Sequence, residues 1–249
     1  MMKAMIFAAG LGTRLKPLTD TMPKALLPIA GKTLLQWQIE KLRNAGIREI
    51  VVNVHHFADQ IIDYLHTNDN FGCQIAVSDE RGQLLETGGG LYKAKDLLCD
   101  GSGTPVLACN VDILSNICIE DLAKAYSPDM LGLLVVSPRQ TQRYLLFDSG
   151  LRLHGWTNIV TGELRPAGLP DACTFRRLAF SGMQILSPVI FGNMETTIAQ
   201  KGCKFSLIDL YLNLCATQPL YGYIPTGYRM MDVGKIDQLA TAESFAATL

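Results

Sequence analysis

Residues 3–14 read KAMIFAAGLGTR. A short apolar run that ends in glycines is typical of a buried strand leading into a tight turn. Glycines let the backbone approach a phosphate closely and turn its N–H groups towards an anion. We therefore predict a strand over Lys3–Ala8, followed by a phosphate-binding loop. The alternative, an ordinary surface turn, accounts for most isolated Gly-x-Gly pairs.

The first half of the chain alternates between strand and helix patterns. We expect strands over Glu49–Val54, Gln74–Val77 and Pro105–Cys109, and helices over Leu34–Asn44, Phe57–His66 and Gly90–Leu98. Strands that are apolar throughout and alternate with helices are typical of a parallel sheet covered on both faces. Open sheets of this class bind ligands at the carboxyl ends of their strands.

Beyond residue 140 the regular alternation of strand and helix patterns ends, and strand patterns dominate. We expect a hairpin of Tyr144–Phe147 and Leu151–His154, strands over Arg177–Leu186 and Pro219–Ile224, a loop over Gly162–Asp171, and helices over Phe205–Cys215 and Lys235–Phe245. Because no flexible linker separates the two halves, we predict that residues 1–249 form a single domain.

Charge and composition limit the function classes. The chain of 249 residues has 22 basic and 23 acidic side chains, a balance that argues against a dedicated nucleic-acid binder. Residues 1–48 carry eight basic and two acidic groups, which favours a small polyanionic ligand such as a nucleotide. No apolar run reaches the ~18 residues of a membrane span. The seven cysteines lack a C-x-x-C spacing, so we expect no disulfide framework and a reduced, cytoplasmic protein.

Two familiar phosphate-binding motifs are excluded, because in each of them a required glycine is missing from this chain. A dinucleotide fingerprint requires a third glycine where this chain has Leu15, and Pro17 would interrupt the helix that follows. This excludes an NAD-dependent dehydrogenase. A Walker loop ending at Gly31-Lys32-Thr33 would place its first glycine at Leu26.

Four segments together resemble the signature of the sugar-nucleotide pyrophosphorylases, also called sugar-1-phosphate nucleotidylyltransferases. They are Gly10-x-Gly-Thr-Arg14-Leu-x-Pro-Leu-Thr19 with Pro23-Lys24 and Pro28-x-x-Gly31-Lys32; Leu85-Glu86-Thr87-Gly88-Gly89-Gly90; Asn110-Val111-Asp112; and Asp232-Val233-Gly234. The resemblance covers essentially the whole chain. Two departures stand out: Val111 replaces the usual glycine, and only Arg165 lies where many members carry a phosphate-gripping lysine. Arg143, Arg165, Arg176 or Arg177 could supply that charge.

The resemblance implies a fold and a reaction. The expected fold is α/β: a Rossmann-like mixed, mainly parallel sheet flanked by helices, of the nucleotide-diphospho-sugar transferase type, with an added sugar-binding β subregion. Residues 1–136 would bind the nucleotide and residues 137–249 the sugar phosphate. The expected reaction transfers a nucleotidyl group from a nucleoside triphosphate to a sugar 1-phosphate, releasing pyrophosphate. Its product would be a sugar-nucleotide precursor of cell wall or polysaccharide.

The resemblance also assigns roles to individual residues. Arg14 would steady the triphosphate and Lys24 the transferring group, while Asp112 and Asp232 would hold Mg²⁺, a cation that prefers hard oxygen ligands. The nucleotide would contact Ala8, Ala9, Gly10, Gly12, Thr13, Glu86, Thr87, Gly88 and Gly89. The sugar phosphate would contact Asn110, Arg143, Trp156, Asn158, Ser181 and Gly182; the segments from Arg139 to Asp148 and from His154 to Asn158 lie where the family places its sugar contacts.

The small size and the Glu86–Gly90 segment most resemble the N-acetylmuramate-1-phosphate uridylyltransferases, together with guanylyltransferases that act on mannose or heptose phosphates. UTP with N-acetylmuramate 1-phosphate or a related hexose 1-phosphate is thus the favoured substrate pair. GTP with mannose or heptose 1-phosphate is the alternative. A third hypothesis, a non-catalytic module that binds a sugar nucleotide, is disfavoured because Arg14, Lys24 and both aspartates are present. The oligomeric state stays open.

Overall fold

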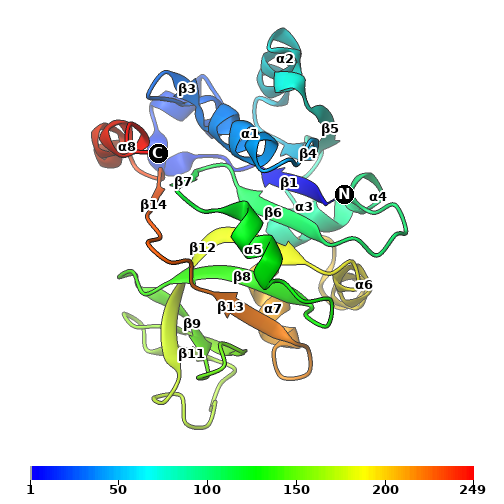
Figure 1. Cartoon of the computed structure of the whole chain (residues 1–249), viewed down its shortest axis with the longest axis vertical. Helices are drawn as coiled ribbons and strands as arrows, with labels where there is room; N and C mark the ends of the chain where they lie inside the picture. Colours follow the sequence, from blue (N-terminus) through cyan, green and yellow to red (C-terminus); the bar gives the residue numbers. More distant parts are fainter. Residues whose placement is uncertain (1) are drawn as a thin grey trace.

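A ten-stranded mixed sheet runs through the molecule in the computed structural model, which describes residues 2–249 (Figure 1). The strands are β1 (Lys3–Phe7), β2 (Pro28–Ile29), β3 (Lys32–Thr33), β4 (Glu49–Val54), β5 (Gln74–Asp79), β6 (Val106–Asn110), β7 (Ile113–Ser115), β8 (Gly132–Ser137), β9 (Arg143–Phe147), β10 (Leu153–Asn158), β11 (Glu163–Arg165), β12 (Arg176–Leu186), β13 (Leu220–Tyr223) and β14 (Met230–Asp232). The α-helices are α1 (Leu34–Asn44), α2 (Ala58–Thr67), α3 (Glu86–Lys93), α4 (Lys95–Leu98), α5 (Ile119–Ala125), α6 (Ile190–Lys201), α7 (Leu207–Leu214) and α8 (Leu239–Ala246).

Two kinds of strand pairing meet in this sheet. Strands β6, β1, β4 and β5 are parallel neighbours, as the alternation of strands and helices predicts. Strand β12 then pairs antiparallel with β6, β8 and β9, and β9 continues through β10 to β11. The expected mixed, mainly parallel central sheet is confirmed, and its antiparallel extension comes from the second half of the chain.

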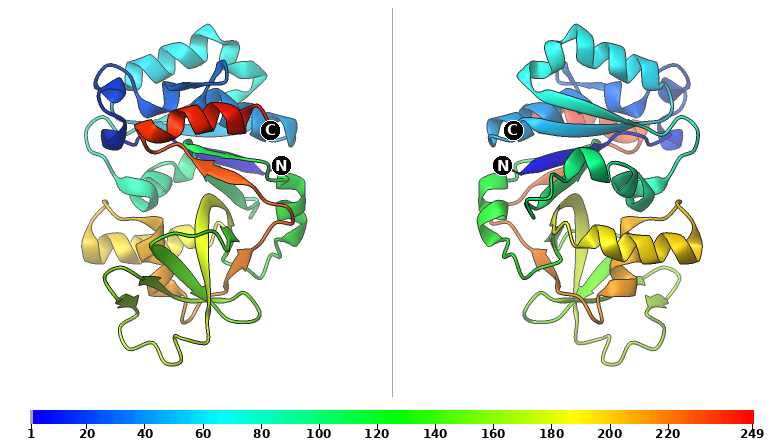
Figure 2. Two further views of the ribbon diagram at one scale, coloured as in Figure 1. Left: turned by 90° about the vertical axis from the view of Figure 1, so that its left-hand side faces the viewer. Right: turned by 90° about the vertical axis from the view of Figure 1, so that its right-hand side faces the viewer.

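Helices cover both faces of the sheet because alternate residues of each strand point in opposite directions (Figure 2). In β1, Ala4 and Ile6 join one apolar core with α1, α2, α5 and α8. Met5 and Phe7 join a second core with α3, α4, α6 and α7. No helix among residues 2–249 has the length and apolar character needed to span a bilayer.

The structure corrects three predicted segments. Helix α3 begins at Glu86 rather than Gly90, so the glycines lie inside its first turns. The expected loop over Gly162–Asp171 contains the short strand β11, which pairs with β10. The expected closing helix over Lys235–Phe245 divides into a 3-10 turn at Ile236–Gln238 and α8. In the first two cases contacts from other parts of the chain override the local pattern.

Candidate active site

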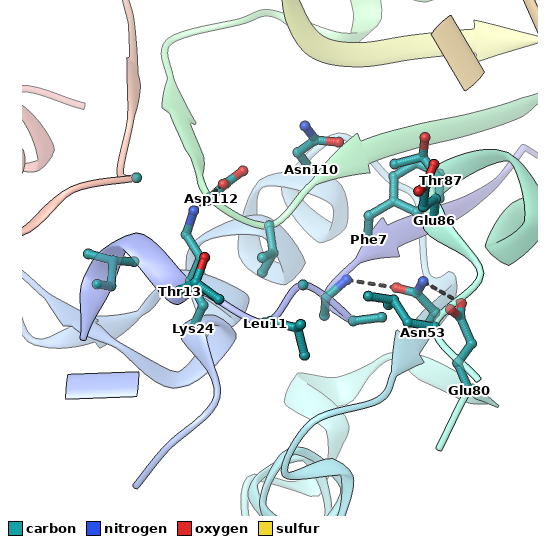
Figure 3. Close-up of a pocket in the computed structure, with 18 of the residues that line it drawn as sticks. Phe7, Leu11, Thr13, Lys24, Asn53, Glu80, Glu86, Thr87, Asn110 and Asp112 are labelled. Atoms are coloured by element: carbon teal, nitrogen blue, oxygen red, sulfur yellow. Dashed lines mark hydrogen bonds and ion pairs between the residues drawn. The ribbon is translucent and has the colours of Figure 1, made fainter. Parts of the chain in front are cut away.

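A cavity of about 520 Å³ opens at the carboxyl ends of β1, β4 and β6 (Figure 3). Its lining residues are Phe7–Leu15, Lys24, Asn53, Glu80, Leu84, Glu86, Thr87, Asn110–Asp112, Ser206 and Gly234. Parallel strands end at the same edge of a sheet, which is where open α/β sheets bind ligands. Arg14, Lys24, Asp112 and most of the expected nucleotide contacts therefore share one cavity.

The loop after β1 depends on Gly12. Its φ of +64° lies in the left-handed region that favours glycine. A Cβ at this position would approach within 2.9 Å of the Thr19 side chain. The buried Thr19 hydroxyl donates a hydrogen bond to the Gly12 carbonyl at 2.9 Å. The Gly12–Thr19 contact folds the loop back on itself and keeps it at the cavity.

Lys24 and Asp112 form an ion pair on the cavity wall (Figure 3). The Lys24 side chain is only 9% exposed and its Nζ donates to Asp112 Oδ2, so the carboxylate compensates the buried ammonium. Lys24 begins a 3-10 turn after Pro23, whereas Asp112 follows the end of β6. The pair thus joins two segments that are 88 residues apart.

Asp232 reaches the same region through the small sheet of β7 and β14. Antiparallel pairing sets Asp232 opposite Ile113, the residue after Asp112. The Val233 N–H donates to the Asp112 carbonyl at 2.9 Å, which fixes the two segments to one another. The structure therefore brings the two predicted metal ligands together although they lie 120 positions apart in the sequence.

The two carboxylates act on each other electrostatically. Asp232 reaches solvent, yet the protein atoms packed around its carboxylate raise the pKa of Asp232, and the negative charge of Asp112 raises it further. Lys24, Arg14 and Arg139 oppose this rise. A bound cation would relieve the repulsion between the two carboxylates.

The donor set fits Mg²⁺. Two aspartates provide hard oxygen ligands, and Mg²⁺ is usually held by one or two carboxylates together with substrate phosphates. Within residues 2–249, no three His, Cys, Asp or Glu side chains gather closely enough to hold a metal by themselves. A cation held by Asp112 and Asp232 would take its other ligands from water and phosphate oxygens.

Gly234 allows Arg14 and Asp232 to approach each other. A Cβ at Gly234 would lie 2.9 Å from Arg14 Nη2 and 2.8 Å from Asp232 Oδ1. A larger residue would therefore push the guanidinium and the carboxylate apart. Gly234 also lines the cavity. Gly234 ends the Asp232-Val233-Gly234 segment, but the sequence analysis gave no role to this glycine.

Asn53 and Glu80 form a buried connection that the sequence analysis missed. The Ala8 N–H donates to Asn53 Oδ1 at 2.7 Å, and Asn53 Nδ2 donates to Glu80 Oε1 at 2.7 Å (Figure 3). Glu80 Oε2 in turn accepts from the Leu85 N–H at 3.1 Å. The two side chains thereby tie the phosphate-binding loop to the start of α3. A polar Asn inside the apolar run of β4 was the available signal.

The second glycine segment divides between two roles. Glu86 and Thr87 line the cavity, and Glu86 has a φ of +61°. Gly88 and Gly89, which were expected to contact the nucleotide, do not line it. A Cβ at Gly88 would lie 2.4 Å from the Phe205 ring, and one at Gly89 would lie 2.0 Å from the Cys203 carbonyl oxygen. These two glycines let α3 pack closely against the segment before α7.

The expected sugar contacts are also split, between residues packed near Asn110 and residues that lie away from the cavity. Gly182, with a φ of +72°, packs against Asn110, because a Cβ added at Gly182 would lie 3.1 Å from Asn110 Nδ2. Ser181 beside it is buried. Arg143, Trp156 and Asn158 lie on β9 and β10 and do not line the cavity, so the structure does not bring them to it. Strand pairing places Arg143 opposite Asn158 on this outer part of the sheet.

Arg165 already has acidic partners. Its Nε donates to Glu163 at 2.7 Å and its Nη1 donates to Asp209 at 2.9 Å. Its guanidinium also lies 5.1 Å from the centre of the Trp156 ring. These contacts neutralise Arg165 and hold β11 against α7. They give no support to Arg165 as the replacement for the missing lysine.

Residues 3–142 match the protein family described as nucleotidyl transferase. The chain belongs to this family. It is 33% identical over 247 residues to N-acetylmuramate alpha-1-phosphate uridylyltransferase of Caulobacter vibrioides, with 97% of this chain and 95% of that protein covered. Identity to the protein of the same name from Neisseria meningitidis serogroup B is 33% over 256 residues, with 98% of each chain covered.

The fold of this nucleotidyltransferase is shared with solved structures. HddC from Yersinia pseudotuberculosis in complex with GMP-PN superposes with a TM-score of 0.76 at 21% identity. The superposition covers 99% of this chain and 100% of that one. The nucleotide-diphospho-sugar transferase type of fold expected from the sequence is thus confirmed.

Proposed function

We propose that this nucleotidyltransferase joins a nucleoside triphosphate to a sugar 1-phosphate, with UTP and N-acetylmuramate 1-phosphate as the favoured pair. The names of the two relatives at 33% identity support this choice, because the chain spans nearly their whole length. The products are a UDP-sugar and pyrophosphate. Residues 1–136 hold the nucleotide and residues 137–249 the sugar phosphate.

The reaction is a single displacement at phosphorus. A phosphate oxygen of the sugar 1-phosphate forms a bond to the α-phosphorus of the triphosphate. The bond from that phosphorus to the β-phosphate bridging oxygen breaks, and pyrophosphate leaves with the electron pair. No side-chain nucleophile is needed because the attacking phosphate is already anionic. Catalysis therefore consists of positioning two anions and stabilising the charge that develops between them.

The chain's own residues supply the positioning. The loop from Ala8 to Thr13 surrounds the triphosphate with the backbone N–H groups that follow Ala8, and Arg14 steadies it. Lys24 holds the transferring phosphoryl group. Burial and the pairing with Asp112 restrict the Lys24 ammonium to one place. A charged donor that is already oriented loses little entropy when the reaction begins.

Asp112 and Asp232 would hold Mg²⁺. The chemistry that a bound Mg²⁺ supplies there is neutralisation of charge on the reacting phosphates. The pairing of β7 with β14 keeps the two carboxylates adjacent before substrate arrives. Lys24 and Arg14 offset part of their mutual repulsion.

One observation carries the proposal: a glycine loop, two cations and two carboxylates from separate segments converge at the carboxyl edge of one sheet. A module that only bound a sugar nucleotide would have no need for two facing carboxylates. Location in the cytoplasm belongs to the same proposal, since all seven cysteines are free thiols, as is usual in a reducing compartment.

A screen of pyrophosphate release tests the proposal. Each of four nucleoside triphosphates is combined with a panel of sugar 1-phosphates, with Mg²⁺ and with excess EDTA. We expect release only when both substrates and Mg²⁺ are present, fastest with UTP and N-acetylmuramate 1-phosphate. A maximum with GTP and mannose or heptose 1-phosphate would select the alternative pair. Binding of UDP-sugars without any turnover would identify the non-catalytic module instead.

A further inference from the structure

The acceptor of the proposed reaction carries its own negative charge, so a cation is needed on the acceptor side of the two aspartates. Arg14 and Lys24 both come from the segments after β1, on the nucleotide side of the cavity. Arg165, the candidate nearest the position of the missing lysine, is bound by Glu163 and Asp209. The sugar phosphate therefore requires another positively charged group.

Arg139 is held against β12, the strand whose Gly182 packs against Asn110 and Ile113 on either side of Asp112. It follows the end of β8, and its Nη2 donates a hydrogen bond to the Phe180 carbonyl of β12 at 3.1 Å. The pairing of β12 with β8 shifts register between Phe180 and Gln184. The guanidinium is thus held at an irregular part of the strand, where a free backbone carbonyl is available.

The same irregular segment contacts the residues that flank Asp112. A Cβ at Gly182 would lie 3.1 Å from Asn110 Nδ2 and 2.9 Å from Ile113 Cγ1. Ile113 is also the residue opposite Asp232 in the small sheet. The carbonyl that orients Arg139 belongs to Phe180. It therefore lies two residues before Gly182, which packs against the residues that flank Asp112.

The charge of Arg139 is not neutralised by a neighbour. Within residues 2–249 it forms no salt bridge with a carboxylate. The Arg139 side chain is exposed, so its guanidinium is open to an anionic ligand.

We propose that Arg139 binds the phosphate of the sugar 1-phosphate and directs its attacking oxygen towards the nucleotide. This inference rests on the proposed function. A guanidinium has five N–H donors, and the Phe180 carbonyl engages one of its nitrogens, so donors remain for a two-point contact with phosphate. The other arginine candidates lie farther along the sheet: Arg143 is on β9, opposite Asn158 of β10, and Arg176 and Arg177 are on the end of β12 that pairs with β9.

Steady-state kinetics of Arg139→Met and Arg139→Lys test the assignment. The acceptor probe is N-acetylmuramate 1-phosphate, or the sugar 1-phosphate that the screen selects, and each substrate is varied separately. We expect Arg139→Met to raise the KM for the sugar 1-phosphate about tenfold or more, as for loss of a charged hydrogen bond. The KM for the triphosphate should stay within about twofold, and Arg139→Lys should recover part of the loss.

Arg48→Met is the matched control. Arg48 is also an exposed arginine, and it donates to the Gly72 carbonyl at 3.4 Å, but it lies before β4, at the amino edge of the sheet. We expect it to change neither KM. In a second measurement, Arg139→Met should weaken binding of the sugar 1-phosphate in the presence of a non-hydrolysable UTP analogue. It should leave binding of the unphosphorylated sugar unchanged.

The outcomes separate this inference from the proposed function. If the wild type turns over and Arg139→Met leaves the KM for the sugar 1-phosphate unchanged, Arg139 is not the phosphate contact, and the proposed function stands. Equal increases in both KM values would overturn the assignment too, because they would indicate general damage to the site. If the wild type neither turns over nor binds any sugar 1-phosphate, the proposed function fails and the assignment fails with it.

Discussion

Asp112 and Asp232 carry like charges on two segments that meet only in the folded chain. We expect Asp112→Asn and Asp232→Asn each to lower kcat by about a hundredfold or more, because loss of one charged contact to a developing phosphate charge costs a few kcal/mol. Each melting temperature should stay close to that of the wild type. Asp63→Asn, which changes an exposed aspartate on α2, is the control and should be fully active. A near-normal kcat in either site variant would contradict the assignment of that aspartate as a metal ligand.

Lys41 illustrates a buried charge without an acidic partner. It lies on α1, and its Nζ donates to the Ser115 hydroxyl of β7 at 3.0 Å. Burial lowers the pKa of Lys41 to about 8 from an ordinary value of 10.5. Between these two pH values the unfolded chain holds a proton that the folded chain has released, so this group makes the fold more stable as the pH rises.

The pH dependence of stability tests that reasoning about Lys41. Lys41→Met removes the buried amine, so its melting temperature relative to the wild type should be highest at about pH 7, where the wild type bears the full burial penalty. The difference between the two proteins should shrink as the pH approaches the ordinary lysine value of 10.5. A difference that stays constant across this window would show that Lys41 is not buried as a charged group.

At the scale of elements, the glycines of α3 determine how closely this helix can approach the segment before α7. Gly89→Ala would place a Cβ against the Cys203 carbonyl oxygen, so we expect it to lower the free energy of unfolding by about 1–3 kcal/mol or more. Gly192→Ala in α6 is the matched control, because a Cβ there meets open space. That variant should be more stable by about 1 kcal/mol, as expected for alanine in a helix. Chemical denaturation measures both values, and a neutral Gly89→Ala would contradict the packing interpretation.

The Asn53–Glu80 connection links two loops at the cavity. Asn53→Ala leaves both the Ala8 N–H and a buried Glu80 oxygen without a partner. We expect a loss of about 2 kcal/mol in the free energy of unfolding, together with a higher KM for the triphosphate, because the phosphate-binding loop is no longer fixed. Asn44→Ala, at the exposed end of α1, should change neither quantity. An unaltered KM would show that the loop holds its shape without Asn53.

Local sequence predicts these elements unevenly. Helix α1 and strand β4 have the predicted limits because their apolar spacing is unambiguous. The start of α3 was misplaced because Gly88 and Gly89 weaken the helical pattern, and their closeness to Phe205 and Cys203 is a tertiary feature. Asn53 was passed over because a polar residue inside an apolar strand indicates a buried hydrogen bond but does not identify its distant partners.

At the scale of the molecule, the two sides of the site differ in how they are built. The proposed nucleotide side comes mostly from the segment after β1, and Arg14 and Lys24, which the sequence analysis singled out, line the cavity. The acceptor side is assembled from β7, β8, β12 and β14, whose pairings join residues far apart in the sequence. The family resemblance suggested Arg143, Trp156 and Asn158, whereas the structure places Gly182 against Asn110 and Ile113, on either side of Asp112.

The central claim is that both anionic substrates bind in one cavity, where the nucleotidyl group of the triphosphate is transferred to the sugar 1-phosphate. Following labelled UTP with N-acetylmuramate 1-phosphate and Mg²⁺ tests it most directly. Label in the α-phosphate should appear in a UDP-sugar, and label in the γ-phosphate should appear in pyrophosphate, both only when the sugar phosphate is present. Label from the γ-phosphate appearing in inorganic phosphate, or release of pyrophosphate at the same rate without a sugar 1-phosphate, would contradict the account.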